Sequence, residues 1–117
     1  MTTDSLENLN QKIAQFAKIR DWDQFHNPKN LAMALIGEAG ELVEHFQWLT
    51  FEQSMQLSPE KRQAVSYELA DILIYLLRMA DRLEIDILQA TQDKMAINEQ
   101  RYPVEKVRGD ARKANEY

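Results

Sequence analysis

Apolar and polar positions along this chain follow a helical period almost from one end to the other. Near the N-terminus, apolar residues recur at spacings of three and four, at Leu6, Leu9, Ile13 and Phe16. That spacing predicts a helix over about residues 5–19 with one apolar stripe. No strand-like alternation is sustained, and three glycines and three prolines leave few interruptions. The pattern predicts an all-α fold of the four-helix-bundle type.

Capping residues mark the starts of three further predicted helices. Asn27 precedes a helix over about residues 28–49, and Ser58 precedes a helix over about residues 59–83. Asp86, with Gln89 three residues later, precedes a helix that ends ahead of Pro103.

The chain has 117 residues, which is enough for one compact domain. We predict that this domain covers residues 1–103. Residues 104–117 form a charged tail that we expect to be mobile or extended. Within the domain, residues 50–57 are predicted to be a loop between the second and third helices.

Composition excludes several classes of protein. There are 14 Lys and Arg against 19 Asp and Glu, a net charge of −5, which argues against a nucleic-acid partner. The lack of cysteine excludes disulfides and thiolate metal sites, and His26 and His45 are too few for a zinc site of several imidazoles. We find no signal-peptide pattern and no apolar run of about 20 residues, so we expect a cytoplasmic protein without a membrane partner.

The predicted helix over 59–83 carries apolar residues on more than one side, at Ile72, Leu73, Ile74, Leu76 and Leu77. A helix that is apolar all round must be buried all round. A small four-helix domain cannot cover such a helix alone, so we expect a homodimer or a homotetramer built as a dimer of dimers.

Two acidic pairs lie inside otherwise apolar helical stretches, Glu38 with Glu41 and Glu68 with Asp71. The i, i+3 spacing puts both members of each pair on one helix face. Burying a carboxylate without a partner is costly, and no matching cationic side chain stands beside these four. Ligation by oxygen alone suits Mg²⁺ or Mn²⁺. Because Mg²⁺ often takes its remaining ligands from substrate phosphates, a nucleoside triphosphate is the natural ligand.

Other interpretations of these acids remain open. They could form a solvated helix flank or pair with Arg78, Arg82 and Lys94. A di-iron carboxylate bundle would need Glu-x-x-His motifs, which are absent because His45 follows Glu41 by four positions. A non-catalytic helical interaction module would use the acids as a binding surface, and it predicts neither metal dependence nor hydrolysis.

Longer sequence strings extend the pattern beyond the acidic pairs. They are RDWDQFH, KNLAMALIGEAGELVEHFQW, ELADILIYLL and KMAINEQRYP, and they run from the end of the first predicted helix to Pro103. With these strings the chain resembles the MazG-like all-α nucleoside triphosphate pyrophosphatases, and most closely their dCTP pyrophosphatase branch. The resemblance covers nearly the whole chain.

The resemblance implies a Mg²⁺-dependent enzyme that cleaves dCTP or a 5-substituted dCTP to the monophosphate and pyrophosphate, as part of nucleotide-pool cleansing. Glu38, Glu41, Glu68 and Asp71 would be catalytic and would be the Mg²⁺ ligands, with Mn²⁺ as an alternative ion. A broad-specificity or damaged-nucleotide pyrophosphatase is the nearest competing function.

The resemblance also implies residues that bind the nucleotide. Trp22 and Trp48 would stack on the base, although either could instead be a core or interface anchor. His26 would belong to the nucleotide-binding connection before the second helix. Tyr75 would contact the sugar region.

The last predicted helix would supply polar groups to the phosphates. Lys94, Asn98 and Arg101 fall on one of its stripes, at spacings of four and three. There is one departure from the family pattern. Animal members of the dCTP branch have a histidine on the first helix where this chain has Ile13, which leaves the base and sugar preference open.

Overall fold

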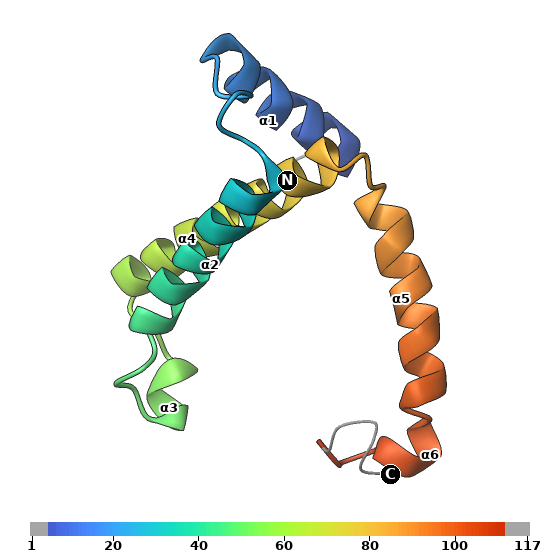
Figure 1. Cartoon of the computed structure of the whole chain (residues 1–117). Helices are drawn as coiled ribbons and strands as arrows, with labels where there is room; N and C mark the ends of the chain where they lie inside the picture. The colour runs from blue at the N-terminus through green and yellow to red at the C-terminus, as the bar shows by residue number, and fades with distance from the viewer. Residues whose placement is uncertain (1–4, 112–117) are drawn as a thin grey trace. The chain divides into compact units, whose positions relative to one another are not determined.

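The computed structural model describes residues 5–111, and every regular element in that range is a helix (Figure 1). The helices are α1 (Leu6–Ile19), α2 (Pro28–Glu44), α3 (Phe51–Ser54), α4 (Pro59–Arg82), α5 (Ile87–Arg101) and α6 (Val104–Val107). The predicted all-α class is confirmed. The chain divides after Glu84 into two compact units, the first with α1–α4 and the second with α5 and α6. The predicted domain limit at residue 103 stays a prediction.

A capping side chain begins each of the four long helices, and the caps predicted for α2, α4 and α5 are confirmed. Each side chain accepts a hydrogen bond from the backbone N–H three residues later: Ser5 from Asn8 at 3.1 Å, Asn27 from Asn30 at 2.9 Å, Ser58 from Lys61 at 3.2 Å, and Asp86 from Gln89 at 3.1 Å. These bonds satisfy backbone donors that a helix start leaves unpaired.

Three segments differ from the prediction. The helix expected to reach residue 49 ends at Glu44 and passes into a turn. The expected loop over 50–57 contains α3, which begins with a reciprocal capping box between Thr50 and Gln53. Residues 104–107 of the expected extended tail form α6, and the part of that tail over 112–117 lies outside the described residues.

The connection from α1 to α2 begins with a left-handed residue. Asp21 has φ 57°, its N–H donates to the Lys18 carbonyl at 3.0 Å, and the Trp22 N–H donates to the Ala17 carbonyl at 3.0 Å. These two bonds form a Schellman motif, which reverses the chain at the helix end. The reversal brings Trp22 back onto α1, where its ring meets Phe16 edge-on with 5.7 Å between ring centroids.

Within the first unit, α2 and α4 lie side by side and antiparallel, and α1 packs against α4 (Figure 1). The core is small: Leu31 of α2 and Leu77 of α4 are the largest fully buried side chains, and Ala17, Val65 and Ala80 complete it. On α4, Leu69, Leu73 and Ile74 remain 53%, 41% and 39% exposed. The helix that is apolar on several sides is therefore only partly covered by α1 and α2.

None of the helices within residues 5–111 combines the length and the apolar character that crossing a bilayer requires.

Leu77 tests the packing of the first unit. Leu77→Ala should lower the free energy of unfolding by about 2–5 kcal/mol, because it removes buried methyl groups and leaves a cavity. Urea denaturation followed by circular dichroism measures the change. Met55→Ala, at a side chain 75% exposed, is the control and should stay within about 0.5 kcal/mol of the parent. Equal effects of the two substitutions would contradict the assignment of this core.

Candidate metal centre and neighbouring cavity

Three of the four predicted carboxylates converge where α2 and α4 pack. Glu38 and Glu41 on α2 and Glu68 on α4 each offer a carboxylate oxygen, and these oxygens lie within 4.8 Å of one another. Asp71 on α4 is outside this cluster, but its negative charge acts on Glu38. Three of the four acids, from two pairs that are 30 positions apart in the sequence, therefore lie together across the helix pair.

The proximity of like charges perturbs Glu38. Burial raises the pKa of Glu38 from 4.5 to about 7, with further contributions from a hydrogen bond to Glu41 and from the charges of Glu41 and Asp71. Both effects disfavour the ionised form. In the absence of a cation, the raised pKa therefore favours the protonated form of Glu38 up to near neutral pH.

Two oxygens of the cluster are left without partners. Glu38 Oε2 and Glu68 Oε2 are buried, and no residue over 5–111 donates a hydrogen bond to either. Buried acceptors are rarely left unpaired unless an ion or a water completes them. Three clustered carboxylates with two orphaned oxygens fit a hard divalent cation such as Mg²⁺ or Mn²⁺.

Basic side chains do not neutralise the cluster within the described part of the chain. His45 lies beside the cluster, with its Nε2 3.8 Å from Glu68 Oε1. Arg78, which could have paired with the acids, instead forms ion pairs with Asp23 and Asp81. The cluster therefore keeps an excess of negative charge.

A cavity of about 300 Å³ lies next to the acids in the first unit. Its lining is mostly apolar and aromatic, with a few polar groups: Ile13, Phe16, Ala17, Trp22, His26, Asp71, Ile74, Tyr75 and Arg78. Three residues predicted to bind nucleotide, Trp22, His26 and Tyr75, thus share one cavity. Asp71 lines the cavity and also acts on Glu38, so the cavity adjoins the candidate metal site.

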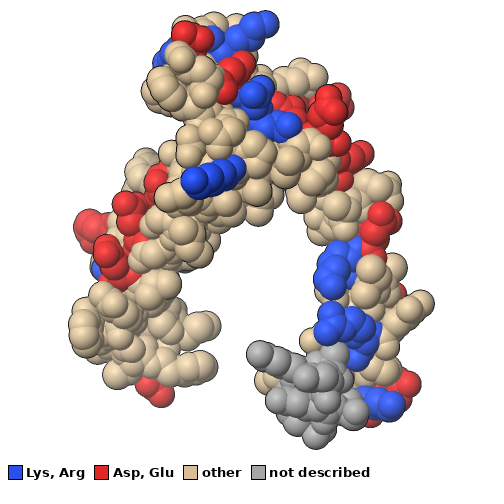
Figure 2. All heavy atoms as spheres, in the orientation of Figure 1, with Lys and Arg blue, Asp and Glu red and all other residues tan. Residues whose placement is uncertain are grey.

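The other predicted nucleotide-binding residues lie elsewhere. Trp48 follows α2, is 86% exposed and does not line the cavity. Lys94, Asn98 and Arg101 are all on α5 in the second unit, where Figure 2 shows basic side chains spaced along the helix. Lys94 and Asn98 line one hollow on the surface of α5. Their roles toward a nucleotide stay predictions.

Sequence reasoning missed Arg78 as a site residue. Only 3% of this residue is exposed. Its Nε donates to His26 Nδ1 at 3.0 Å, one terminal nitrogen donates to Asp81 at 2.9 Å, and the other pairs with Asp23. No local motif signals this network, because His26 and Asp23 are more than 50 positions away in the sequence.

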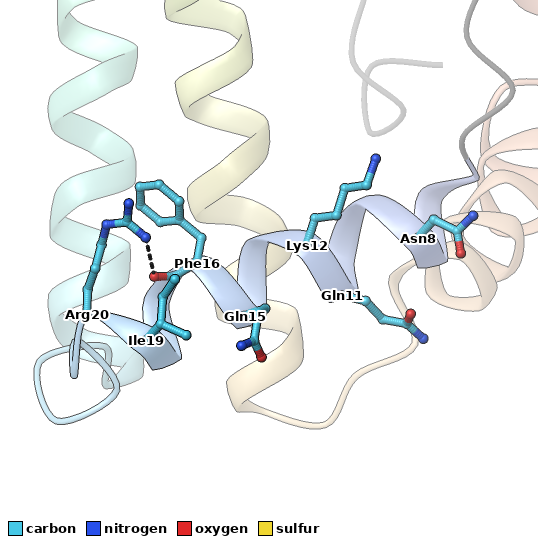
Figure 3. Close-up of a pocket in the computed structure, with 7 residues that line it drawn as sticks. All are labelled: Asn8, Gln11, Lys12, Gln15, Phe16, Ile19 and Arg20. Atoms are coloured by element: carbon cyan, nitrogen blue, oxygen red, sulfur yellow. Dashed lines mark hydrogen bonds between the residues drawn. The ribbon is translucent and has the colours of Figure 1, made fainter.

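A groove along α1 makes a useful contrast with the cavity. It is lined by one helix alone, and Figure 3 shows Gln11 and Gln15 on one edge and Lys12 and Phe16 on the other. The guanidinium of Arg20 lies 3.6 Å from the Phe16 ring centroid and donates to the Phe16 carbonyl at 3.0 Å. The groove contains no member of the carboxylate cluster, and we assign it no function.

Comparisons with known proteins identify the family of this chain. A sequence profile of the MazG-like family matches residues 36–116, which include all four acids and α5. The chain belongs to the MazG-like family. It is 49% identical over 109 residues to dCTP pyrophosphatase 1 of Bos taurus and 46% identical over 114 residues to dCTP pyrophosphatase 1 of Homo sapiens. These alignments cover 92% and 96% of the chain.

A solved structure has the same MazG-like fold. The crystal structure of a pyrophosphatase from Archaeoglobus fulgidus superposes with a TM-score of 0.81 at 36% identity, over 88% of this chain and 96% of that one. The bovine and human relatives are longer, and the chain spans 64% and 67% of their lengths.

The raised pKa of Glu38 predicts a pH-dependent effect on stability. In metal-free protein, Glu38→Gln should be more stable than the parent at pH 8, by on the order of 1 kcal/mol. The parent loses stability as pH rises from about 4.5 through about 7, because its folded state must then ionise a carboxyl that its unfolded state ionises more readily. Urea denaturation at pH 4, 6 and 8 measures this difference, which should vanish at pH 4.

Added Mg²⁺ or Mn²⁺ should reverse that order at pH 8, because a cation that binds only the folded parent stabilises it. Glu44→Gln, at an exposed position on α2, is the matched control and should respond to the metal like the parent. A Glu38→Gln protein that gains as much from the metal as the parent would exclude Glu38 from the site.

Proposed function

We propose that this chain is a nucleoside triphosphate pyrophosphohydrolase that cleaves dCTP or a 5-substituted dCTP to the monophosphate and pyrophosphate. The observation that carries the proposal is the cluster of Glu38, Glu41 and Glu68 beside a cavity of aromatic residues, with Asp71 reaching both. The bovine and human dCTP pyrophosphatases support the choice of nucleotide. The role fits cleansing of the nucleotide pool, and we place it in the cytoplasm because free nucleotides are found there.

Glu38, Glu41, Glu68 and Asp71 would hold the cofactor, Mg²⁺ or Mn²⁺. A bound divalent ion supplies charge neutralisation on the phosphates and lowers the pKa of a coordinated water. The protein contributes the all-oxygen ligand set and the buried orphaned oxygens of Glu38 and Glu68 that favour cation binding.

Glu38 is the best candidate for the general base. Its carboxyl lies in the acidic cluster, and a bound cation would keep it ionised and so able to accept a proton. Ionised Glu38 would accept a proton from the attacking water. The water oxygen then forms a bond to phosphorus, and the bond between the α- and β-phosphates breaks with pyrophosphate as the leaving group.

The cavity would bind the nucleoside. Trp22 offers a flat ring for stacking on a base, and Tyr75 offers a hydroxyl for the sugar region. Ile13 and Phe16 add apolar surface to the same space. Lys94, Asn98 and Arg101 would supply donors to the phosphates and to the leaving pyrophosphate. Trp48 would contribute a second stacking surface.

A broader specificity is the second candidate function. Stacking alone tolerates every base, and Ile13 gives the cavity no polar group at its position. A broad-specificity or damaged-dNTP pyrophosphatase would use the same carboxylates and the same hydrolysis. A non-catalytic interaction module would require neither the metal nor the cavity.

Product analysis tests the function. With Mg²⁺, the protein should release pyrophosphate and dCMP from dCTP faster than products from dATP, dGTP and dTTP. Glu68→Gln and Asp71→Asn should each lower turnover by more than about 100-fold, since loss of a group that merely orients a metal ligand already costs about 10–100-fold. Circular dichroism should show unchanged helix content.

Glu60→Gln, at an exposed position on α4, is the control and should keep full activity. Equal rates on all four dNTPs would favour the broader specificity. Absence of hydrolysis with both Mg²⁺ and Mn²⁺ would contradict the enzyme.

We also propose that the chain assembles as a homodimer or as a dimer of dimers. The exposed apolar side chains Leu69, Leu73 and Ile74 on α4 support this, because such a face is normally buried against a partner. Light scattering should give a mass of two or four times the chain mass of 13.7 kDa. A monomeric mass at micromolar concentration would rule out the assembly.

A further inference from the structure

We propose that Arg78 is a positioning residue that locks His26 in the tautomer with its proton on Nε2, so that the cavity presents an N–H donor to a hydrogen-bond acceptor on the nucleobase. The acceptor would be a carbonyl oxygen or an unprotonated ring nitrogen. This inference rests on the proposed function, because it concerns how the same cavity recognises its substrate.

The tautomer follows from the chemistry of the Arg78–His26 contact. Arg78 Nε lies 3.0 Å from His26 Nδ1, and a guanidinium nitrogen can donate a hydrogen bond but cannot accept one. The Nδ1 atom must therefore be the unprotonated acceptor. In a neutral imidazole the proton is then on Nε2, and no hydrogen bond within the described residues uses that nitrogen.

Burial and the neighbouring arginines favour the neutral form of the His26 ring. Burial lowers the pKa of His26, the positive charge of Arg78 lowers it further, Asp23 opposes the shift, and Arg82 adds to it. A doubly protonated ring would also place an N–H against the Arg78 N–H. Asp23 and Asp81 meanwhile hold the Arg78 guanidinium from its other side.

The main chain of His26 is held as firmly as its ring. Arg82, one turn after Arg78 on α4, donates from Nε to the His26 carbonyl at 3.1 Å. The His26 N–H donates to the Trp22 carbonyl at 3.1 Å, and the ring centroids of His26 and Trp22 lie 6.1 Å apart. A stacking surface and an oriented donor are thus fixed relative to each other before a ligand enters, which lowers the cost of binding.

The cavity has few other groups that could read a base edge. Ile13, Phe16, Ala17 and Ile74 in the lining are apolar. Arg78 already donates to three partners, and Asp71 is an acceptor placed beside the acidic cluster. Trp22 and Tyr75 also line the cavity and carry an indole N–H and a hydroxyl. His26 differs from them because the Arg78 contact at Nδ1 fixes which ring nitrogen carries the proton.

The tautomer can be read directly from the folded protein. Long-range ¹H–¹⁵N spectra of ¹⁵N-histidine-labelled parent protein should show the Nε2–H pattern for His26 at pH 7.5, because each tautomer has its own pair of nitrogen shifts. Arg78→Met should give mixed tautomers, and Arg62→Met, at an exposed position on α4, should leave the pattern unchanged. An Nδ1–H pattern in the parent overturns the proposal, even if Arg78→Met fails to fold.

The role in recognition is tested with two substrates, dCTP and deoxyribose 5′-triphosphate, which lacks a base. Arg78→Met should raise KM for dCTP by about 10-fold with a smaller change in kcat, as expected when one buried hydrogen bond is lost. KM for the abasic triphosphate should not change. If Arg78 had a purely structural role, Arg78→Met would raise KM for both substrates equally. That result would overturn the proposal.

Substitutions of His26 give an independent comparison. His26→Gln keeps an N–H donor near the Nε2 position and should retain much of the preference for dCTP over the abasic substrate, whereas His26→Phe should lose it. Equal loss in the two variants would count against a donor role. If the parent hydrolyses no nucleotide, the proposed function fails, and the tautomer spectrum still decides the Arg78–His26 assignment.

Discussion

Repulsion among carboxylates held between α2 and α4 is the constraint on which the rest of the structure depends. Apolar packing brings these two helices side by side, and Glu38, Glu41 and Glu68 come with them to within 4.8 Å of one another. The fold relieves the repulsion at neutral pH by partly protonating Glu38, whose pKa is raised to about 7. A divalent cation would relieve it more completely, because it would also pair the orphaned oxygens of Glu38 and Glu68.

The distribution of positive charge supports the same interpretation. Arg78 is the buried cation of the described core, yet it is matched with Asp23 and Asp81. This pairing anchors the connection between α1 and α2 to α4 and leaves the acidic cluster open to a metal. One arginine thus shapes the cavity that would hold a base, and the acids beside it would hold the ion that engages the phosphates. In the proposed enzyme this arrangement would separate recognition of the base from the chemistry.

Local signals in the sequence predicted much of the fold. The side-chain caps Asn27, Ser58 and Asp86 were predicted at the starts of α2, α4 and α5, because capping chemistry is local. The end of α2 at Glu44 was missed, since the apolar pattern continues through FQWL with no Gly or Pro to mark the stop. The short helix α3 could have been found, because Thr50 and Gln53 form a capping box.

Local signals also predicted part of the candidate site, whereas its long-range contacts could not be predicted from the sequence. The i, i+3 spacing brought out Glu38, Glu41, Glu68 and Asp71, since helical periodicity alone places each pair on one face. The partnership of Arg78 with His26 joins residues 52 positions apart and depends on how α4 meets the α1–α2 connection. Periodicity says nothing about such a contact. The resemblance to a known family supplied Trp22, His26 and Tyr75, which the fold then gathered in one cavity.

Calorimetric titration of the metal-free protein with Mn²⁺ tests the central claim most directly, that the acidic cluster is a cation site. Near pH 7, in two buffers of different ionisation enthalpy, the apparent enthalpy of binding should differ between the buffers, because the cation displaces a proton from Glu38. Above about pH 8 that difference should disappear, since Glu38 is then already ionised. Absence of Mn²⁺ binding, or binding that Glu38→Gln and Glu68→Gln leave unchanged, would contradict the claim.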